Sequence, residues 1–241
     1  MLKGGKKINT SSLIEQIVMA SQQEIHDNIF KACTTEQLMK AYDQWSETYD
    51  HVFFHNDHNL VSLQGVKLVS SLLEEGVLKY QPFVRILDLA CGTGCAGHRL
   101  KTHFGDRIEV VGIDLSPGML SKAKARNVYA RLEQSALPDM PKDLGVFDVV
   151  MCFGAFVPNH LPESVLGCFF DVAKRDTSSW LVFSVRDQLV GEMESSFAFL
   201  PAALVDKQRL LYLSPESSEV TDPVEANYYI LAVNGDALRT L

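Results

Sequence analysis

The chain has 241 residues, 46% of them apolar, and is therefore long enough to bury a full core as one α/β domain with extensions. Its formal net charge of −8 argues against a general electrostatic hold on nucleic acid, which needs Lys and Arg clustered on one face. No stretch approaches the roughly 18 uninterrupted apolar residues of a membrane span. We therefore expect neither nucleic acid nor a membrane as a partner, and the oligomeric state stays open.

The cysteines and the N-terminal sequence indicate the cellular compartment in which the protein is expected. The five cysteines are odd in number, and Cys91, Cys152 and Cys168 fall at positions expected to be buried or to line a site. The basic start of the chain is followed by an apolar run that Glu15 and Gln16 interrupt, which is not the core of a signal peptide. Both features predict a reducing, cytoplasmic location.

The N-terminal quarter reads as helices. Residues 1–10 are expected to form a loose tail and residues 11–31 one or two short helices. Thr34–Gln37 has the Thr-x-x-Gln form of a capping box. Apolar and aromatic side chains then repeat at the spacing of an amphipathic helix: Leu38, Tyr42, Trp45, Tyr49 and Phe53. A further helix is predicted through Leu60 to Leu73, with Gly76 placed to end it. We predict residues 1–58 as a helical extension or lid on a domain at 59–241.

Strands and helices alternate through the middle of the chain. Strands are predicted near residues 83–89, 108–113, 128–132, 147–153 and 180–185, with helices between most of them. This order is typical of a doubly wound parallel sheet. Two later runs, 209–213 and 228–233, leave no room for a long helix between them and should pair as an antiparallel hairpin at one edge. The predicted fold is α/β, with a seven-stranded, mostly parallel sheet and an antiparallel last strand.

A glycine-rich turn between two acidic strand ends is the most informative feature. The run Val84-Arg-Ile-Leu-Asp-Leu-Ala-Cys-Gly-Thr-Gly94 is followed, one helix later, by Glu109-Val-Val-Gly-Ile-Asp114. Glycines allow a sharp turn and let the backbone lie against a ligand, and the helix that follows points unpaired N–H groups at the same place. A carboxylate at the tip of the second strand can accept hydrogen bonds from both ribose hydroxyls. The pattern indicates a site for a nucleoside-bearing cofactor.

Four segments in the right order carry a family resemblance. Ile86-Leu-Asp-Leu-Ala-Cys-Gly-Thr-Gly94 and Gly112-Ile-Asp-Leu-Ser-Pro-Gly-Met119 resemble the first two signatures of Rossmann-like, S-adenosylmethionine-dependent class I methyltransferases. Phe147-Asp-Val-Val-Met-Cys-Phe-Gly-Ala155 resembles the strand that closes the site, and Ala41-Tyr-Asp-Gln-Trp-Ser-Glu-Thr-Tyr-Asp50 a preceding helix. The resemblance covers residues 36–186 and is closest to the methyltransferase-like family of the Williams–Beuren syndrome region. It implies S-adenosylmethionine as cofactor and a reversed last strand.

The resemblance also implies roles for individual residues. Asp88 and the backbone of Ala90, Cys91, Gly92 and Gly94 would hold the methionine moiety, and Asp114 the ribose. The remaining cofactor contacts implied are Leu115 and Met119 against the adenine, Ser135 and Ala136 at its edge, and Phe153, Gly154 and Tyr49 around the site. The segment Glu133-Gln-Ser-Ala136 departs from the family, which often has an acid at the adenine edge.

Two side chains are candidates for the chemistry. His160 follows the fourth strand on a loop at the carboxyl edge, where its ordinary pKa near neutrality would suit a general base. Tyr49 would reach the cofactor or cover it. Each also has a plainer interpretation, an inert loop histidine and a core aromatic. Methyl transfer to a small-molecule acceptor requires mainly alignment and exclusion of water, so few acid–base groups are expected.

Two other functions remain as alternatives. Gly92-Thr-Gly-Cys-Ala-Gly97 fits G-x-G-x-x-G, which suggests an NAD-dependent reductase. Asp88, however, lies where it would repel a diphosphate, whereas a cationic sulfonium and ammonium suit an acid. The other alternative is a non-catalytic S-adenosylmethionine-binding protein.

No metal site is predicted. His51, His55 and His58 lie at i, i+4 and i+7, which could gather three imidazoles on a helix face, but no acid clearly completes the set and histidines also suit a helix end. Cys91 and Cys95, near His98, are better explained as small packing groups.

Overall fold

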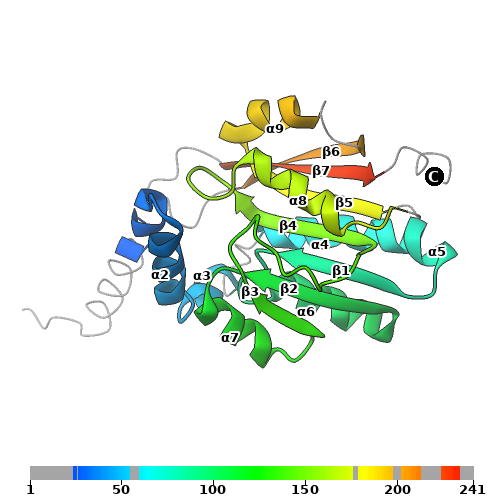
Figure 1. Ribbon diagram of the computed structural model, residues 1–241, viewed down its shortest axis with the longest axis horizontal. Helices are drawn as coiled ribbons and strands as arrows, with labels where there is room; N and C mark the ends of the chain where they lie inside the picture. Colours follow the sequence, from blue (N-terminus) through cyan, green and yellow to red (C-terminus); the bar gives the residue numbers. More distant parts are fainter. Residues whose placement is uncertain are drawn as a thin grey trace, which may run out of the picture.

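The computed structural model describes residues 24–25, 27–54, 60–175, 179–197, 202–212 and 224–233. These residues form a seven-stranded sheet in the order β3-β2-β1-β4-β5-β7-β6 (Figure 1). Its strands are β1 (Val84–Leu89), β2 (Ile108–Asp114), β3 (Arg131–Gln134), β4 (Val149–Phe156), β5 (Ser179–Arg186), β6 (Ala202–Tyr212) and β7 (Val224–Val233). β1 to β5 pair in parallel, and β7 pairs antiparallel with both β5 and β6. The predicted fold class is confirmed.

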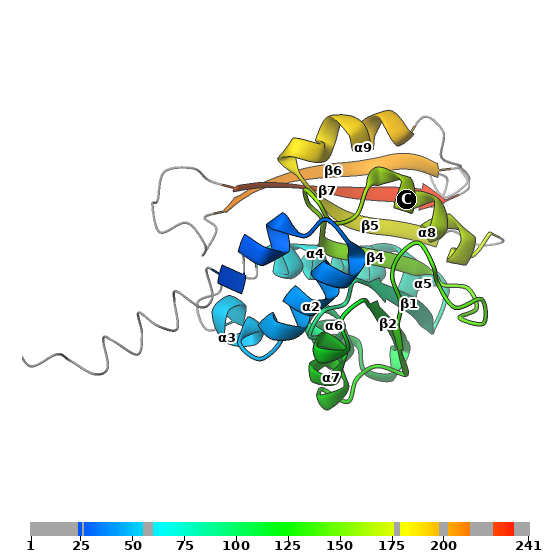
Figure 2. The ribbon, with the colours of Figure 1, turned by 60° about the vertical axis from the view of Figure 1, so that its left-hand side comes forward.

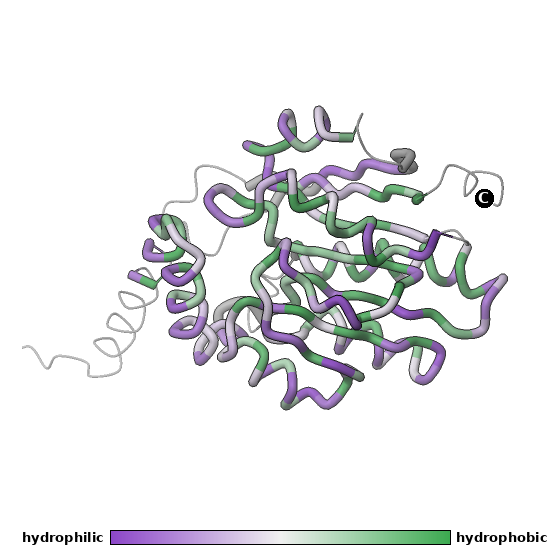
Figure 3. Tube along the Cα trace, in the orientation of Figure 1, coloured by the Kyte–Doolittle hydropathy of each residue, from purple (hydrophilic) through white to green (hydrophobic). Residues whose placement is uncertain are grey.

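The central strands are buried because both of their faces are covered. In β1, Val84 and Ile86 pack into one hydrophobic cluster, whereas Leu87 and Leu89 pack into the cluster on the opposite side. This alternation follows from the two-residue period of a strand. Apolar residues run along these strands (Figure 3), as expected for a parallel sheet covered by helices.

Helices cover both faces. Residues of α4 (Leu60–Leu72) and α6 (Cys95–Phe104) belong to one of the two clusters, and residues of α8 (Leu166–Val172) and α9 (Val190–Phe197) to the other. α7 (Pro117–Ala125) connects β2 to β3 (Figures 1 and 2). Short 3₁₀ turns at Gly105–Arg107, Glu163–Val165 and Asp187–Leu189 complete the connections. Among the described helices, none has the length and apolar character that a membrane crossing requires.

The N-terminal segment, residues 27–54, lies at the carboxyl ends of the parallel strands (Figures 1 and 2). It contains α2 (Thr35–Trp45) and α3 (Tyr49–Phe54). The capping box is present, since the Gln37 N–H donates to Thr34 Oγ1 and the Gln37 side chain accepts from the Cys33 N–H. The single helix expected through Phe53 is instead broken at 46–48, where the Ser46 hydroxyl donates to the Asp43 carbonyl.

Three expected boundaries are wrong. Gly76 does not end the helix: the chain continues through a π-helical turn, Leu73–Val77, into α5 (Leu78–Tyr80), because Leu73 and Leu78 on both sides of Gly76 are buried. β3 begins at residue 131 rather than 128, since residues 127–130 leave α7 through a left-handed Asn127. The hairpin strands β6 and β7 are also longer than the runs 209–213 and 228–233.

Candidate functional site

A cavity opens at the carboxyl ends of β1, β2 and β4, beneath the N-terminal segment. Its volume is about 870 Å³, counting the space at its open mouth. A smaller pocket of about 370 Å³ adjoins it, and Tyr49, Ala90, Gly92 and Phe153 line both. This is the edge of a doubly wound sheet at which ligands bind, and β1 and β4 lie where the strand order reverses.

The turn after β1 has a backbone shaped for a ligand. Ala90, Gly92 and Gly94 all have positive φ, at 52°, 55° and 81°. Residues other than glycine rarely adopt this backbone conformation. The left-handed Ala90 is therefore strained, and strained residues of this kind cluster at binding sites. A Cβ built on Gly92 would meet nothing within 4 Å, which leaves the backbone open to the cavity. Gly94 has another role, because it caps α6 and its Cα faces the Tyr129 ring, which a Cβ would approach to 2.8 Å.

Asp114 joins the glycine turn to the end of β2. Its Oδ2 accepts a hydrogen bond from the Gly92 N–H at 2.7 Å, and its Oδ1 accepts one from the Ser116 N–H at 2.9 Å. A carboxylate has about four lone-pair sites, so both oxygens retain capacity toward the cavity. Burial raises the pKa of Asp114 to about 6, although these backbone hydrogen bonds act in the opposite direction.

Asp88 lies in the smaller pocket and is 2% exposed. The Tyr129 hydroxyl donates to its Oδ2 at 2.7 Å. Burial is the main reason why the pKa of Asp88 rises to about 7, and the nearby Asp114 raises it further. Two carboxyl groups held in a largely desolvated site are costly unless a cation pairs with them. The two carboxyls therefore fit a cationic ligand whose hydroxyl groups can donate to them, and they do not fit a diphosphate.

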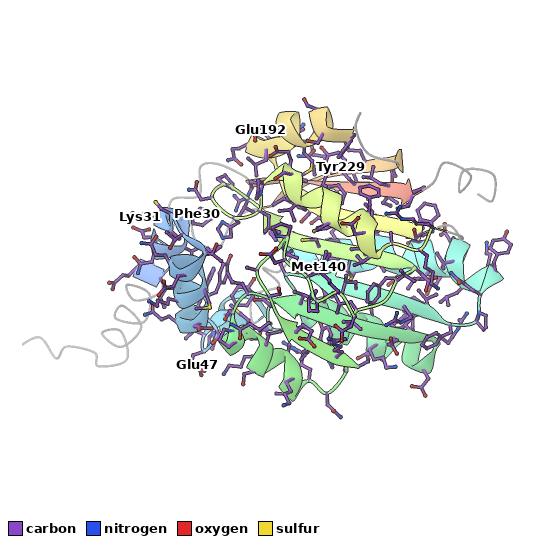
Figure 4. All side chains as sticks on the ribbon, in the orientation of Figure 1. Phe30, Lys31, Glu47, Met140, Glu192 and Tyr229 are labelled. Carbon is purple, nitrogen blue, oxygen red and sulfur yellow. The ribbon has the colours of Figure 1, made fainter. Side chains whose placement is uncertain are left out.

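Three acidic residues attach the N-terminal segment to α7. The Asp43 carboxylate accepts from the Ser116 hydroxyl and, at 2.8 Å, from the Gly118 N–H at the start of α7. Glu47, labelled in Figure 4, pairs with Lys122 at 3.0 Å, and Asp50 pairs with Arg126 at 2.8 Å. Tyr42 and Tyr49, each one residue before an attached aspartate, line the cavity. The repeated Tyr-Asp thus has a physical reason: the acid binds α7 and the aromatic ring faces the site.

Asp43→Ala should loosen this attachment. The carboxylate interacts with the positive end of the α7 dipole and with two donors, so its loss should cost about 1 kcal/mol or more of local stability. Hydrogen exchange of the α2 amides is expected to become about fivefold faster. Gln44→Ala, on the same helix and with an exposed side chain, is the matched control. If the α2 amides exchange at the same rate in Asp43→Ala and in the native protein, the Asp43 contact does not stabilise the attachment of α2 to α7.

His160 meets the N-terminal segment at the far wall of the cavity. Its Nδ1 lies 2.9 Å from the Pro158 carbonyl, which can only accept, so this nitrogen carries the proton. Its Nε2 lies 2.8 Å from the Tyr42 hydroxyl, 118 residues away in the chain. Burial lowers the pKa of His160 and so favours the neutral ring. In this state Nε2 accepts a hydrogen bond from the Tyr42 hydroxyl.

The structure gathers the predicted site residues at this edge of the sheet. Those that line the main cavity are Tyr49, Ala90, Gly92, Asp114, Leu115, Met119, Ser135, Ala136, Phe153, Gly154 and His160. Asp88 and Cys91 line the smaller pocket. Gly94 is the exception and lines neither. Burial raises the pKa of the Cys91 thiol, as expected for a packing group rather than a metal ligand.

Two residues that form hydrogen bonds at the site, Tyr42 and Tyr129, are not among the predicted site residues. The helical spacing predicts Tyr42 as a core aromatic, and the repeated Tyr-Asp is the pattern that could have marked it as part of the site. Tyr129 belongs to no recognisable pattern. Of the three spaced histidines, His55 and His58 lie outside the described residues, and no group of three potential metal ligands occurs in the part of the chain that the structure describes.

Comparisons with known proteins point to one class. Residues 86–176 match the family model described as "Methyltransferase domain". The chain is similar to human methyltransferase-like protein 27, with 30% identity over 128 residues that cover 52% of this chain and 49% of that protein. It is also 28% identical over 139 residues to the aklanonic acid methyltransferase DauC of Streptomyces sp. (strain C5), covering 54% of this chain and 56% of that protein. The chain thus spans about half the length of these relatives.

Solved structures agree on the fold. A putative class I S-adenosylmethionine-dependent methyltransferase from Listeria monocytogenes superposes with a TM-score of 0.55 at 16% identity, covering 86% of this chain and 71% of that one. The sheet order, the glycine turn and the family match over residues 86–176 lead to one assignment. Residues 86–176 have the sequence features of a methyltransferase domain, and the fold is that of the Listeria structure.

Proposed function

We propose that this protein transfers a methyl group from S-adenosylmethionine to a small-molecule acceptor. The observation that carries the proposal is the pair of buried strand-end carboxyls, Asp88 and Asp114, on either side of a left-handed glycine turn at the base of a covered cavity. A cofactor with an ammonium group, a sulfonium and a ribose satisfies both carboxyls. A nicotinamide dinucleotide would bring its diphosphate against them, so we do not favour a reductase.

The two pockets suggest how the cofactor divides between them. Asp88 and Cys91 in the smaller pocket, with the backbone of Ala90 and Gly92, would hold the methionine part. Asp114 would bind the ribose hydroxyls. Leu115 and Met119 would contact the adenine, with Ser135 and Ala136 at its edge. The Ser135 hydroxyl already donates to the Asp139 carbonyl, so its adenine contact would come from the backbone or from packing.

The protein's part in the reaction would be mainly alignment and enclosure. When bound, S-adenosylmethionine supplies a methyl group that its positive sulfur already makes reactive. Phe153, Gly154 and Tyr49 would form the wall on which donor and acceptor are aligned. The N-terminal segment would exclude water, and we propose that residues 1–58 act as a lid on the domain at 59–241. His160 would serve as a general base and Tyr49 would contact the cofactor.

Several observations favour a small acceptor. The N-terminal segment covers part of the cavity and is attached to α7 at three points, which narrows access to the site. One relative, aklanonic acid methyltransferase, is named for a single compound. The Tyr-Asp helix also supports membership of the methyltransferase-like family of the Williams–Beuren syndrome region.

Two measurements test the function. Calorimetry with S-adenosylmethionine and S-adenosylhomocysteine should show binding of both, and no binding of either at millimolar concentration would refute the proposal. Incubation of a cell extract with the protein and a methyl-labelled donor should then label a low-molecular-weight compound. Binding without any labelled compound across such extracts would favour the non-catalytic alternative instead.

A further inference from the structure

Resting on the proposed function, we infer that Tyr42 and His160 form a proton relay for an acceptor hydroxyl, and that the acceptor is an apolar molecule with a weakly acidic hydroxyl such as a phenol or enol. Tyr42 comes from α2, and His160 from the loop after β4. Both line the main cavity. The proposal rests on the direction of the hydrogen bond between them and on the residues around it.

The hydrogen bonds orient the pair for accepting a proton. Because the Pro158 carbonyl requires a proton on His160 Nδ1, Nε2 of the neutral ring is an acceptor, and the Tyr42 hydroxyl donates to it. A phenol oxygen that donates one hydrogen bond can still accept another. An acceptor hydroxyl in the cavity can thus donate to Tyr42 Oη without any rearrangement of the pair. The Pro158 carbonyl would stabilise the imidazolium that forms.

The step balances. As the acceptor oxygen bonds to the methyl carbon, the carbon–sulfur bond breaks and its electron pair stays on sulfur. The acceptor's proton moves to Tyr42 Oη, and the Tyr42 proton moves to His160 Nε2. S-adenosylhomocysteine, a methyl ether and a protonated His160 result, and the imidazolium then loses its proton to solvent.

The surroundings of the relay select the acceptor class. Leu38, Leu161 and Phe153 give this part of the cavity apolar walls. The described residues that line it include no Lys or Arg, so a carboxylate or phosphate there would have no cation in direct contact. Arg186, which is outside this lining, is the cation whose charge acts on His160 and lowers its pKa further. An alkylammonium has no lone pair for the attack until it loses its proton, and its charge is disfavoured beside apolar walls. A neutral hydroxyl keeps a lone pair on its oxygen and can pass its proton to the relay as the new bond forms. A weakly acidic hydroxyl matches the base.

The pair also bridges two parts of the chain. Phe30 contacts the His160 ring at 5.7 Å between centroids, and the Asn159 side chain donates to the Phe30 carbonyl at 2.9 Å. Phe30, labelled in Figure 4, belongs to the N-terminal segment, as Tyr42 does. The relay is therefore complete only while this segment lies against the loop after β4, which would couple enclosure to proton transfer.

The first test needs no acceptor. In protein saturated with S-adenosylhomocysteine, the His160 ring signal is assigned by its loss in His160→Gln and titrated by NMR. Tyr42→Phe removes the donor that favours the neutral ring, so the His160 midpoint should rise by roughly 0.5 to 1 pH unit. Tyr80→Phe, which removes an exposed phenol oxygen, is the matched control and should leave the midpoint unchanged. An unchanged midpoint in Tyr42→Phe overturns the relay.

The second test addresses the chemistry. With S-adenosylmethionine as donor, 2-naphthol, 2-naphthylmethylamine and 2-naphthoic acid are compared by release of S-adenosylhomocysteine. We expect turnover of the naphthol alone, rising with pH through the His160 midpoint, and a loss of at least tenfold in kcat for Tyr42→Phe with an unchanged Kd for S-adenosylhomocysteine. Preference for the amine or acid, undiminished turnover in Tyr42→Phe, or no turnover of the naphthol overturns the inference. Failure to bind S-adenosylhomocysteine would instead overturn the proposed function.

Discussion

Asp114→Ala is expected to lower the affinity for S-adenosylmethionine and S-adenosylhomocysteine by about 100-fold or more. Hydrogen bonds to a charged group contribute about 1.5 to 3 kcal/mol each, and the carboxylate is placed to accept from two ribose hydroxyls. It also holds the Gly92 N–H, so its loss releases the glycine turn from the end of β2. Calorimetry on the purified variant at pH 7.5 measures the effect.

A matched variant separates a local effect from a general loss of charge. Asp106→Ala removes an exposed acid near the opposite end of β2 and should bind both ligands as the native protein does. Asp114→Ala should remain folded, because burial of this carboxyl already disfavours its charged form. If a folded Asp114→Ala binds within threefold of the native affinity, the ribose contact lies elsewhere.

Asp88→Asn is expected to stabilise the cofactor-free protein while reducing its cofactor affinity. Burial raises the pKa of Asp88 to about 7 in the folded chain, far above that of an aspartate in an unfolded chain. The folded state therefore binds the proton more tightly, and this contribution to stability is complete at low pH and is lost as pH rises through about 7. The neutral amide removes the pH dependence, and at pH 8 the gain should be on the order of 2 to 4 kcal/mol.

Cofactor binding should instead favour the ionised form of Asp88, since the cationic part of the cofactor pairs with the carboxylate. Native affinity for S-adenosylmethionine should increase from pH 5.5 to 8, with release of protons on binding below pH 7. In Asp88→Asn the affinity should be lower and its dependence on pH much weaker. Thermal melts at pH 5.5 and 8, together with calorimetry in buffers of different ionisation enthalpy, measure both effects. Destabilisation by Asp88→Asn at pH 8, or an affinity that falls as pH rises, would contradict the assignment.

The contrast between the two acids shows how the site is constructed. Asp114 receives backbone N–H groups from both sides, whereas Asp88 receives the Tyr129 hydroxyl and the Gly97 N–H in a tighter enclosure. Tyr129 fits there because Gly97 and Gly112 have no side chain: a Cβ on either would lie within 3 Å of its ring or hydroxyl. A cofactor-free protein that keeps two such carboxyls is less stable than it could be, which is typical of a functional site.

The sheet, and the meeting of the predicted cofactor residues at one edge of it, could be predicted from the sequence alone. Apolar runs bounded by glycines predict buried parallel strands, and residues adjacent to strand ends, such as Asp88, Gly92 and Asp114, must meet at one edge because parallel strands all end there. These are local consequences of backbone geometry, so a single chain is enough to read them.

Contacts between distant parts of the chain could not be predicted in this way. The Asp43 contact with α7, the Tyr129–Asp88 hydrogen bond and the Tyr42–His160 pair all join residues far apart in the chain. Gly76 fails as a helix end for the same reason, since burial of the residues around it outweighs its local preference. Periodicity specifies which face of an element is apolar, but it carries no information on which distant side chain that face will meet.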